Sequence, residues 1–325
     1  MNLIVFDLEW NIGYQTRTFE YHGVEQTLRG EIIQIGAVKI NEQAQVLDTF
    51  RINLKPRIFR KLQHHIAKVT GLTQQDLDAG VPIKEGLRRF VQWAGEDAAF
   101  AEWGLDDVPV LKQNLYLVGL DDTWPREWYD IQRLFLREYP RQEGEGMTLE
   151  SVVERLGLPM DRPFHDALAD ALYTVDVCTR LDLEQGLAAY PTEANQLREA
   201  LCSDPEAEYL DFRHFTGFLD KEGFRTQEEV QNIHCPLCEE KLSPAEIWLK
   251  RGNTGYYTLT ACPQDHQWLV RIKLMRRDGL HWSVGRCLEK PTQQSLARWE
   301  EQKKKYLIRL QKAAEKAEKE KSGNQ

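Results

Sequence analysis

The chain has 325 residues and a net charge of −9, with 51 acidic residues against 42 lysines and arginines. This length favours two domains rather than one. The acidic balance argues against a nucleic-acid partner, because such partners usually demand a basic surface. The charge is unevenly distributed along the chain. Residues 230–325 carry 18 basic and 11 acidic residues, whereas residues 1–229 carry 24 basic and 40 acidic residues. We therefore expect a positively charged surface only in the last third of the chain.

Signals for secretion or membrane insertion are weak. The first apolar run, Leu3–Phe6, is far too short for a signal peptide, and later stretches fall short of the ~18 apolar residues of a membrane span. The cysteines, at positions 178, 202, 235, 238, 262 and 287, are too sparse for a secreted disulfide scaffold. We expect a soluble cytoplasmic protein without a membrane partner, whose reduced thiols are free to bind a metal.

Strand and helix patterns alternate in the first half of the chain. Residues 2–10, 31–40 and 45–54 have the short apolar or β-branched runs that are typical of strands. The spacing of apolar residues predicts a helix over 83–94. Further elements are expected at 98–103 (strand), 107–118 (helix), 128–135, 148–156 (helix) and 165–183 (helix). This order predicts an α/β domain with a mixed sheet.

Changes of composition divide the chain into four segments. Residues 1–183 form the α/β domain, and residues 184–232 are expected to be a partly helical, acidic connector. Residues 233–290 contain cysteine pairs, glycine turns and alternating strands, which predict a small β domain. Residues 291–325 are rich in lysine and glutamate and suit a charged helical or disordered tail.

Asp7 and Glu9 stand two apart on the first predicted strand, so their side chains point to the same face. A half-exposed strand with a polar face would explain an isolated pair of this kind. Neighbouring carboxylates repel each other unless cations intervene, and hard oxygen ligands are those that Mg²⁺ and Mn²⁺ accept. The pair is therefore a candidate metal site if other acids accompany it.

Two further segments supply such acids. Asp106 and Asp107 stand where a predicted strand passes into a helix, a place where an acid can also be an ordinary N-cap. His165 is followed by Asp166 and Asp170, which lie one helical turn apart on one face. Together these residues form a concentrated acid-base site, but their types leave open which acid of each pair takes part.

The three motifs resemble those of the DEDDh exonuclease family in order and spacing. They are Asp-x-Glu at 7–9, Trp-Gly-x-x-Asp-x-x-x-Leu at 103–111 and His-x-x-x-x-Asp at 165–170, and Thr-Gly-Leu-Thr at 70–73 resembles the family's Thr-Gly-Ile-Thr turn. The family includes oligoribonuclease, ribonuclease T, polymerase proofreading subunits and bacterial sporulation-inhibitor-like exonucleases. The resemblance covers residues 1–183 and implies a ribonuclease H-like fold, in which helices flank a mixed five-stranded sheet.

The resemblance further implies a 3′→5′ exonuclease that hydrolyses single strands to nucleoside 5′-monophosphates by two-metal-ion catalysis. The family pattern selects Asp107 over Asp106 and Asp170 over Asp166. The implied ligands of two Mg²⁺ or Mn²⁺ ions are Asp7, Glu9, Asp107 and Asp170. His165 is the implied general base, because an imidazole with a pKa near ~6.5 can accept a proton at neutral pH.

Two closely spaced ligand pairs predict a zinc site in the small β domain. The four candidate ligands are Cys235, Cys238, Cys262 and His266. Such pairs on two turns present a tetrahedral set, and the pattern resembles a zinc ribbon. We expect one structural Zn²⁺, since four protein ligands leave no open position. Cys287 and His234 remain alternatives to the last ligand, and reduced cysteines in a small core remain an alternative to the metal.

Basic residues of this domain are interleaved with tyrosine and tryptophan. The candidates for phosphate contacts are Arg271, Lys273, Arg276 and Arg277. Cations beside stacking rings are typical of single-strand binding, so the expected partner is single-stranded RNA or DNA. A solvated face above an aromatic core is the alternative. Two other functions stay open: a non-catalytic nucleic-acid-binding adaptor, and a short-oligonucleotide exonuclease whose zinc unit binds a protein partner.

Overall fold

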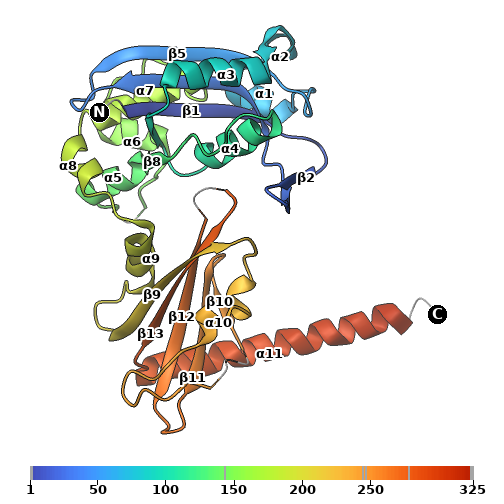
Figure 1. Ribbon diagram of the computed structural model, residues 1–325, viewed down its shortest axis with the longest axis vertical. Coiled ribbons are helices and arrows are strands. Elements are labelled where there is room, and N and C mark those ends of the chain that lie inside the picture. Colours follow the sequence, from blue (N-terminus) through green and yellow to red (C-terminus); the bar gives the residue numbers. More distant parts are fainter. Residues whose placement is uncertain (1–2, 143, 244, 246, 277–278, 323–325) are drawn as a thin grey trace. The chain divides into compact units, whose positions relative to one another are not determined.

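The computed structural model describes residues 3–142, 144–243, 245, 247–276 and 279–322. It divides the chain into two compact units, of which the first extends to Tyr190 and the second begins at Pro191 (Figure 1). Each unit has its own sheet and its own hydrophobic core. Among the described residues, no helix is both long and apolar enough to cross a membrane.

A mixed sheet with the strand order β6-β5-β4-β1-β7-β8 organises the first unit. Its strands are β1 (Leu3–Asn11), β4 (Glu31–Ile40), β5 (Val46–Lys55), β6 (Val81–Pro82), β7 (Ala99–Glu102) and β8 (Glu127–Asp130). The central β1 pairs antiparallel with β4 and parallel with β7. The expected five-stranded mixed sheet is confirmed, and the two-residue β6 extends its edge. A separate hairpin joins β2 (Thr18–Tyr21) to β3 (Val24–Thr27).

Helices cover both faces of this sheet (Figure 1). They are α1 (His64–Thr70), α2 (Gln74–Ala79), α3 (Ile83–Ala94), α4 (Asp107–Leu117), α5 (Ile131–Glu138), α6 (Leu149–Arg155), α7 (Ala167–Cys178) and α8 (Leu183–Ala188). One core lies between the sheet and α3 and α4, and another lies between the sheet and α5, α6 and α7. Because both faces are buried, the central strands are continuous apolar runs rather than alternating ones.

An antiparallel sheet with the order β10-β11-β12-β13-β9 organises the second unit. Its strands are β9 (Tyr209–Phe218), β10 (Leu249–Arg251), β11 (Gly255–Ala261), β12 (Gln267–Met275) and β13 (Trp282–Glu289). Its helices are α9 (Glu193–Leu201), the 3₁₀ turn η1 (Gly223–Arg225), α10 (Glu228–Gln231) and α11 (Gln293–Ser322). The core is built around the buried rings of Phe224, Tyr256 and Trp268.

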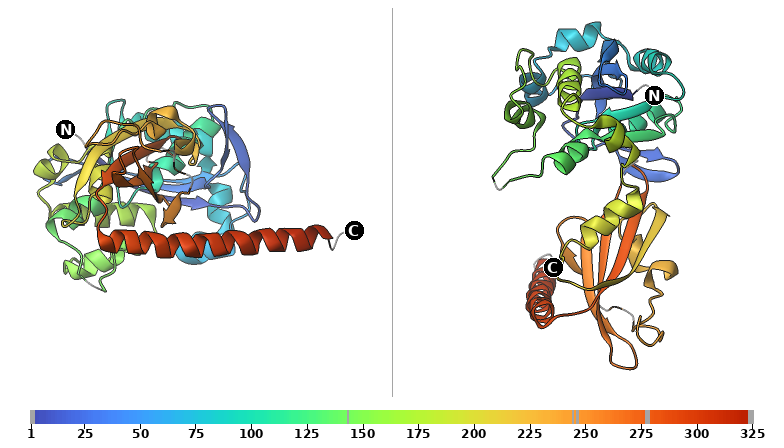
Figure 2. Two further views of the ribbon diagram at one scale, coloured as in Figure 1. Left: turned by 90° about the horizontal axis from the view of Figure 1, so that it is seen from below. Right: turned by 90° about the vertical axis from the view of Figure 1, so that its left-hand side faces the viewer.

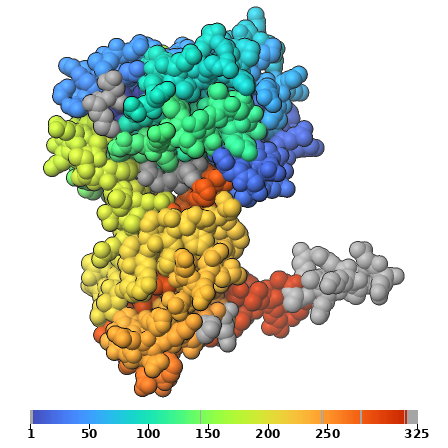
Figure 3. All heavy atoms as spheres, viewed as in Figure 1, coloured from blue at the N-terminus to red at the C-terminus, as the bar shows by residue number. Residues whose placement is uncertain are grey.

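These units differ from the segments expected from the sequence. The expected connector 184–232 supplies α8 to the first unit and α9, β9 and α10 to the second. The β domain expected at 233–290 is therefore part of a larger sheet, because β9 completes its edge by pairing with β13. In the segment 291–325, α11 packs through Trp299 and Tyr306 on the strands and then leaves the body of its unit (Figure 2, Figure 3).

Candidate functional site

The central strand β1 carries two of the candidate acids on one face. Leu3 and Val5 belong to the core on the α7 side of the sheet, whereas Phe6 belongs to the core on the α4 side. The same alternation directs Asp7 and Glu9 toward α7. Both acids are partly buried, so they lie at the point where the apolar run gives way to a polar site.

Helix α7 can reach this face because the neighbouring strand β4 lacks a side chain there. Gly36 is the register partner of Asp7. A Cβ atom on Gly36 would lie 2.0 Å from the backbone carbon of Ala167 and 2.0 Å from the backbone nitrogen of Leu168. These are backbone atoms that cannot rotate aside, so glycine is required for this close approach. Gln34 of β4 accepts a hydrogen bond from the N–H of Ala167 at 2.9 Å and fixes the turn.

The start of α7 contributes three polar side chains. Asp166 caps the helix and forms an ion pair with Arg51 of β5. Asp170 is buried and accepts the N–H of His165 at 2.9 Å. His165 is exposed and has a left-handed φ of 63°. Ligand atoms of Glu9, His165 and Asp170 lie within 4.8 Å of one another. Asp166 is thus occupied elsewhere, whereas Asp170 joins the acids of β1.

The fourth acid comes from the start of α4. Asp107 is buried, and its Oδ1 accepts the N–H of Leu8 at 3.1 Å, which holds the carboxylate against β1. The N–H of Asp107 donates to Oε2 of Glu102 at 2.7 Å. The side chain of Asp106, in contrast, is 80% exposed and pairs with Arg29. The structure therefore brings Asp107 rather than Asp106 next to β1.

The four acids perturb one another. Burial, and next the charges of Asp107 and Asp170, raise the pKa of Asp7 well above its ordinary value. Burial and neighbouring acids raise the pKa of Glu9 to about 8. Burial also raises the pKa of Asp107 to about 7 and that of Asp170 to about 6, although backbone N–H donors oppose the change. Each ionised carboxylate thus destabilises the others, and a cation would relieve this repulsion.

The site fits divalent cations by the chemistry of its donors. Among the described residues, Oδ1 of Asp170 is buried and has no hydrogen-bond partner. An unpaired carboxylate oxygen in such a place costs free energy unless an ion or water compensates it. Carboxylate oxygens with one adjacent imidazole suit Mg²⁺ or Mn²⁺ better than soft metals. The four acids therefore suit hard divalent ions as a donor set.

Two residues of the site were not predicted from the sequence. Glu102 at the end of β7 is completely buried, and burial raises its pKa well above the ordinary value. The sequence signal that could have indicated Glu102 is its position directly before Trp103, the first residue of the second motif. Arg51 supplies a positive charge to Asp166. Nothing in the sequence around Arg51 indicates this partner, because the two residues meet only in the folded sheet.

The four candidate zinc ligands come together in the second unit. They lie on two turns, at 235–240 and 262–266, which backbone hydrogen bonds close. Sγ of Cys238 and Sγ of Cys262 are 3.5 Å apart, and Nδ1 of His266 lies 3.6 Å from Sγ of Cys235. All four ligand atoms lie within 4.8 Å of one another. A tetrahedral ion with Zn–S bonds of about 2.3 Å would separate its sulfur ligands by about 3.8 Å, which agrees with this geometry.

An outer hydrogen bond supports the cluster. Nε1 of Trp268 donates to Sγ of Cys235 at 3.3 Å. Burial opposes ionisation of Cys235, but this bond and backbone N–H donors outweigh it and lower the thiol pKa to about 6. Cys287 lies on β13 next to Cys202, and His234 is exposed. Neither belongs to the four-residue cluster found among the described residues, so His266 is the better fourth ligand.

The basic residues expected to contact phosphates have different environments. Arg271 is anchored by an ion pair with Glu289. Lys273 follows two residues later on the same face of β12 and is partly buried. The guanidinium of Arg276 lies 5.0 Å from the centre of an indole ring. Arg277 lies outside the described residues. Arg271 therefore has a structural partner within its unit, which distinguishes it from the other candidates for phosphate contacts.

Comparison with known families bears on the first unit. Residues 18–178 match the family model described as "RNase_T: Exonuclease". The first unit is a domain of this exonuclease family. The matched range includes Asp107, His165 and Asp170, whereas β1 with Asp7 and Glu9 ends at Asn11, before the range begins. The resemblance seen in the sequence motifs is therefore confirmed for the exonuclease domain.

Relatives of the exonuclease domain are distant. The chain is 26% identical over 174 residues to "DNA polymerase III PolC-type" of Clostridium perfringens, covering 54% of this chain but 11% of that protein. It is 27% identical over 143 residues to "Probable 3'-5' exonuclease KapD" of Bacillus subtilis, covering 44% and 68%. The structure of E. coli exonuclease I in complex with a dT13 oligonucleotide has a TM-score of 0.50 and 15% identity, covering 84% and 55%. That similarity concerns the fold alone.

Proposed function

We propose that the chain is a 3′→5′ exonuclease that hydrolyses single-stranded nucleic acid to nucleoside 5′-monophosphates. The observation that carries the proposal is that Glu9, Asp170 and the exposed His165 form one cluster, with Asp7 and Asp107 next to it, in a domain of the exonuclease family. The relative from B. subtilis is named a probable 3'-5' exonuclease, which supports the same direction of hydrolysis.

The protein's part in catalysis is to hold ligands in place. The proposed ligands of two divalent ions are Asp7, Glu9, Asp107 and Asp170. Bound ions would activate a water molecule and offset the charge on the leaving 3′ oxygen. The N–H of Leu8 fixes the carboxylate of Asp107, and the N–H of His165 fixes that of Asp170. These contacts orient the acids before a substrate arrives, so binding does not have to order them.

His165 is proposed as the general base. Its ring is exposed at the edge of the acid cluster, with a nitrogen within 4.8 Å of ligand atoms of Glu9 and Asp170. A neutral imidazole can take a proton from the attacking water at neutral pH. Because the side chain is open to solvent, the proton can leave after each turnover. Both properties suit a base that acts repeatedly.

The second unit is proposed to contain one structural Zn²⁺ and to help hold the strand. The Cys₃His set leaves no coordination position open, which favours a structural role. The ion would join two turns that are separated in the sequence and so stabilise the sheet that carries the basic residues. The excess of basic residues over acids in 230–325 supports binding of a polyanion.

Digestion of 5′-labelled strands by the full chain tests the proposed activity. Single- and double-stranded RNA and DNA are incubated with Mg²⁺ or Mn²⁺, and the products are separated by length. A ladder that shortens from the 3′ end, with release of nucleoside 5′-monophosphates, is expected for a single strand. Internal cuts would refute the proposal. Binding without hydrolysis would instead identify a non-catalytic adaptor.

A further inference from the structure

The second unit contains a groove over one face of its sheet. The strand register places Gly255 beside Lys273 and Tyr257 beside Arg271 on that face. A cavity of about 550 Å³ opens above these residues, and its walls come from the loop after α9 and from the first turns of α11. Its volume lies within the usual range of ligand-binding clefts. The whole groove is formed within one compact unit.

Basic side chains outnumber acidic ones in the groove. The basic residues are Arg251, Arg271, Lys273 and Arg298, and the acidic ones are Asp204 and Glu289. Lys250 also borders the groove, but its ammonium lies over the Tyr256 ring on the opposite face of the sheet. Glu289 is already paired with Arg271. In the part of the chain that the structure describes, no carboxylate forms an ion pair with Arg251, Lys273 or Arg298. The groove therefore keeps positive charge that an anionic ligand could neutralise.

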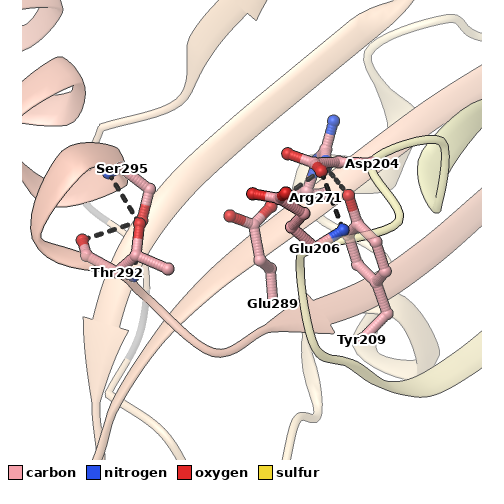
Figure 4. Close-up of polar contacts among 7 residues, drawn as sticks. All are labelled: Asp204, Glu206, Tyr209, Arg271, Glu289, Thr292 and Ser295. Atoms are coloured by element: carbon pink, nitrogen blue, oxygen red, sulfur yellow. Dashed lines mark hydrogen bonds and ion pairs between the residues drawn. The ribbon is translucent and has the colours of Figure 1, made fainter.

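Arg271 is fixed in the floor of the groove. Its Nη1 donates to the hydroxyl of Tyr209 and to Oε2 of Glu289, each at 2.9 Å (Figure 4). The side chains of Arg271 and Glu289 are both only 12% exposed. Asp204 and Glu206, from the loop after α9, lie next to this group (Figure 4). The phosphate contact expected of Arg271 is therefore better assigned to the cations around it.

The aromatic ring of Tyr257 lines the same groove as these cations. Tyr257 packs edge-on against Trp299 of α11, with ring centres 5.6 Å apart and an angle of 73°. Arg251 lies close enough for its charge to act on the Tyr257 hydroxyl. Gly255 lies two residues before Tyr257 on the same face of β11, and because it has no side chain it leaves space in the floor of the groove beside the ring. A groove that combines an aromatic ring with unpaired cations can bind the base and the phosphates of one strand.

We propose that this groove is a binding site for a single strand of nucleic acid, in which Arg251, Lys273 and Arg298 contact phosphates and Tyr257 stacks on a base. The inference rests on the proposed function, which supplies the substrate class, and it locates the contacts of the second unit. An acidic peptide would match the cations but would leave the ring without a stacking partner. A nucleic-acid strand matches both features.

Fluorescence anisotropy of the full chain with a 5′-fluorescein-labelled single strand of about 15 nucleotides tests the site. It is measured without added Mg²⁺ or Mn²⁺, so that binding does not depend on hydrolysis. Combined Arg251→Ser, Lys273→Ser and Arg298→Ser substitutions should raise Kd at least about tenfold at low salt. They should also make the slope of log K against log salt shallower by about 2, because single strands contribute about 0.7 per phosphate contact.

The matched control removes three exposed charges from the outer part of α11, by Lys304→Ser, Arg309→Ser and Lys312→Ser. Equal Kd values and salt slopes for the two triple variants would overturn the inference, as would a wild-type chain that does not bind the strand. Tyr257→Leu should weaken binding whereas Tyr257→Phe should not, which keeps the test valid if one variant is unstable. Competition by a free nucleoside monophosphate as effective as that by the strand would overturn a strand site.

The experiments distinguish a wrong assignment of the binding site from a wrong assignment of the activity. If the wild type binds the strand and the groove variant does not, the site stands whether or not Mg²⁺ then supports hydrolysis. If the wild type releases nucleoside 5′-monophosphates but the groove variant binds like its control, the activity stands and the site is refuted. Melting temperature and zinc content, compared with the wild type, show that each variant is folded.

Discussion

Replacing Glu9 by glutamine removes one charge from the acid cluster at nearly constant side-chain volume. Burial and the neighbouring acids raise the pKa of Glu9 from 4.5 to about 8. Because a tenfold change in acid dissociation corresponds to about 1.4 kcal/mol, ionised Glu9 lowers the free energy of unfolding by at most about 5 kcal/mol above pH 8. Without divalent ions, we therefore expect the Glu9→Gln protein to be more stable than the wild type at pH 8.

The sign of the pH dependence follows from which state binds more protons. The raised pKa means that folded Glu9 keeps its proton between about pH 4.5 and pH 8, where the unfolded chain has lost it. The stability that this group contributes is therefore present at low pH and is lost as pH rises through that window. Glutamine does not titrate, so the difference between variant and wild type should be small near pH 4.5 and largest at pH 8 and above.

Calorimetry of the full chains over this pH range measures the effect on the first unit. At pH 8 without added Mg²⁺ or Mn²⁺, Glu9→Gln should raise the melting temperature by at least about 3 °C. With excess divalent ion, the wild type should have the higher melting temperature, because it binds the ions more tightly than the Glu9→Gln protein does. Glu25→Gln, at an exposed acid of β3, is the control and should change neither value. Two results would refute the reasoning. One is a Glu9→Gln protein that melts below the wild type without ions, and the other is a Glu9→Gln protein that still melts above the wild type when ions are in excess.

Three further variants test separate parts of the structure. His165→Ala should slow hydrolysis by about 10²–10⁴ and remove the acid limb of the pH–rate profile; an unchanged profile would assign the base to another group. Gly36→Ala should displace α7 and lower kcat about 10²-fold in a chain that is folded by circular dichroism, and a normal rate would show that the Cβ atom is accommodated. Cys235→Ser with Cys238→Ser should release zinc and raise KM for long strands only. Unchanged KM in the zinc-free protein would favour a protein partner for this unit.

The central part of the fold was predictable because its strands are buried on both faces. The apolar runs that predicted strands at 2–10, 31–40 and 45–54 correspond to β1, β4 and β5. Such runs carry a strong local signal, since nearly every side chain enters one core or the other. The acids that interrupt β1 and open α4 also stood out against this background, but the choice of Asp107 over Asp106 came from the resemblance to the exonuclease motifs.

Residues that act only through the folded arrangement were not predicted. Gly36 permits the approach of α7 to β1, and this role depends on a contact with Ala167 far along the chain. Glu102 supports the backbone of Asp107 from a neighbouring strand. The local pattern gives no reason to select Gly36, and the only sequence signal for Glu102 is its place directly before Trp103 of the second motif.

The second unit was predicted less well because its sheet depends on long-range pairing. Strand β9 contains only partly buried and exposed residues and follows an acidic stretch, which suggested a connector. Its place in the sheet is set by pairing with β13, about seventy residues later. In the same way, the basic character of Arg271 was visible in the sequence, but its ion pair with Glu289 was not.

The most direct test of the two-metal proposal is the rate at which the Asp7→Asn protein shortens a 5′-labelled single strand in Mg²⁺. Asp7 lies among the other three acids, and the substitution removes its charge while keeping its shape. The matched control is Asp106→Asn, whose side chain is 80% exposed and points to Arg29. We predict that Asp7→Asn abolishes release of nucleoside 5′-monophosphates while Asp106→Asn keeps the wild-type rate. A folded Asp7→Asn protein with more than about a tenth of the wild-type rate would contradict two-metal catalysis at this site.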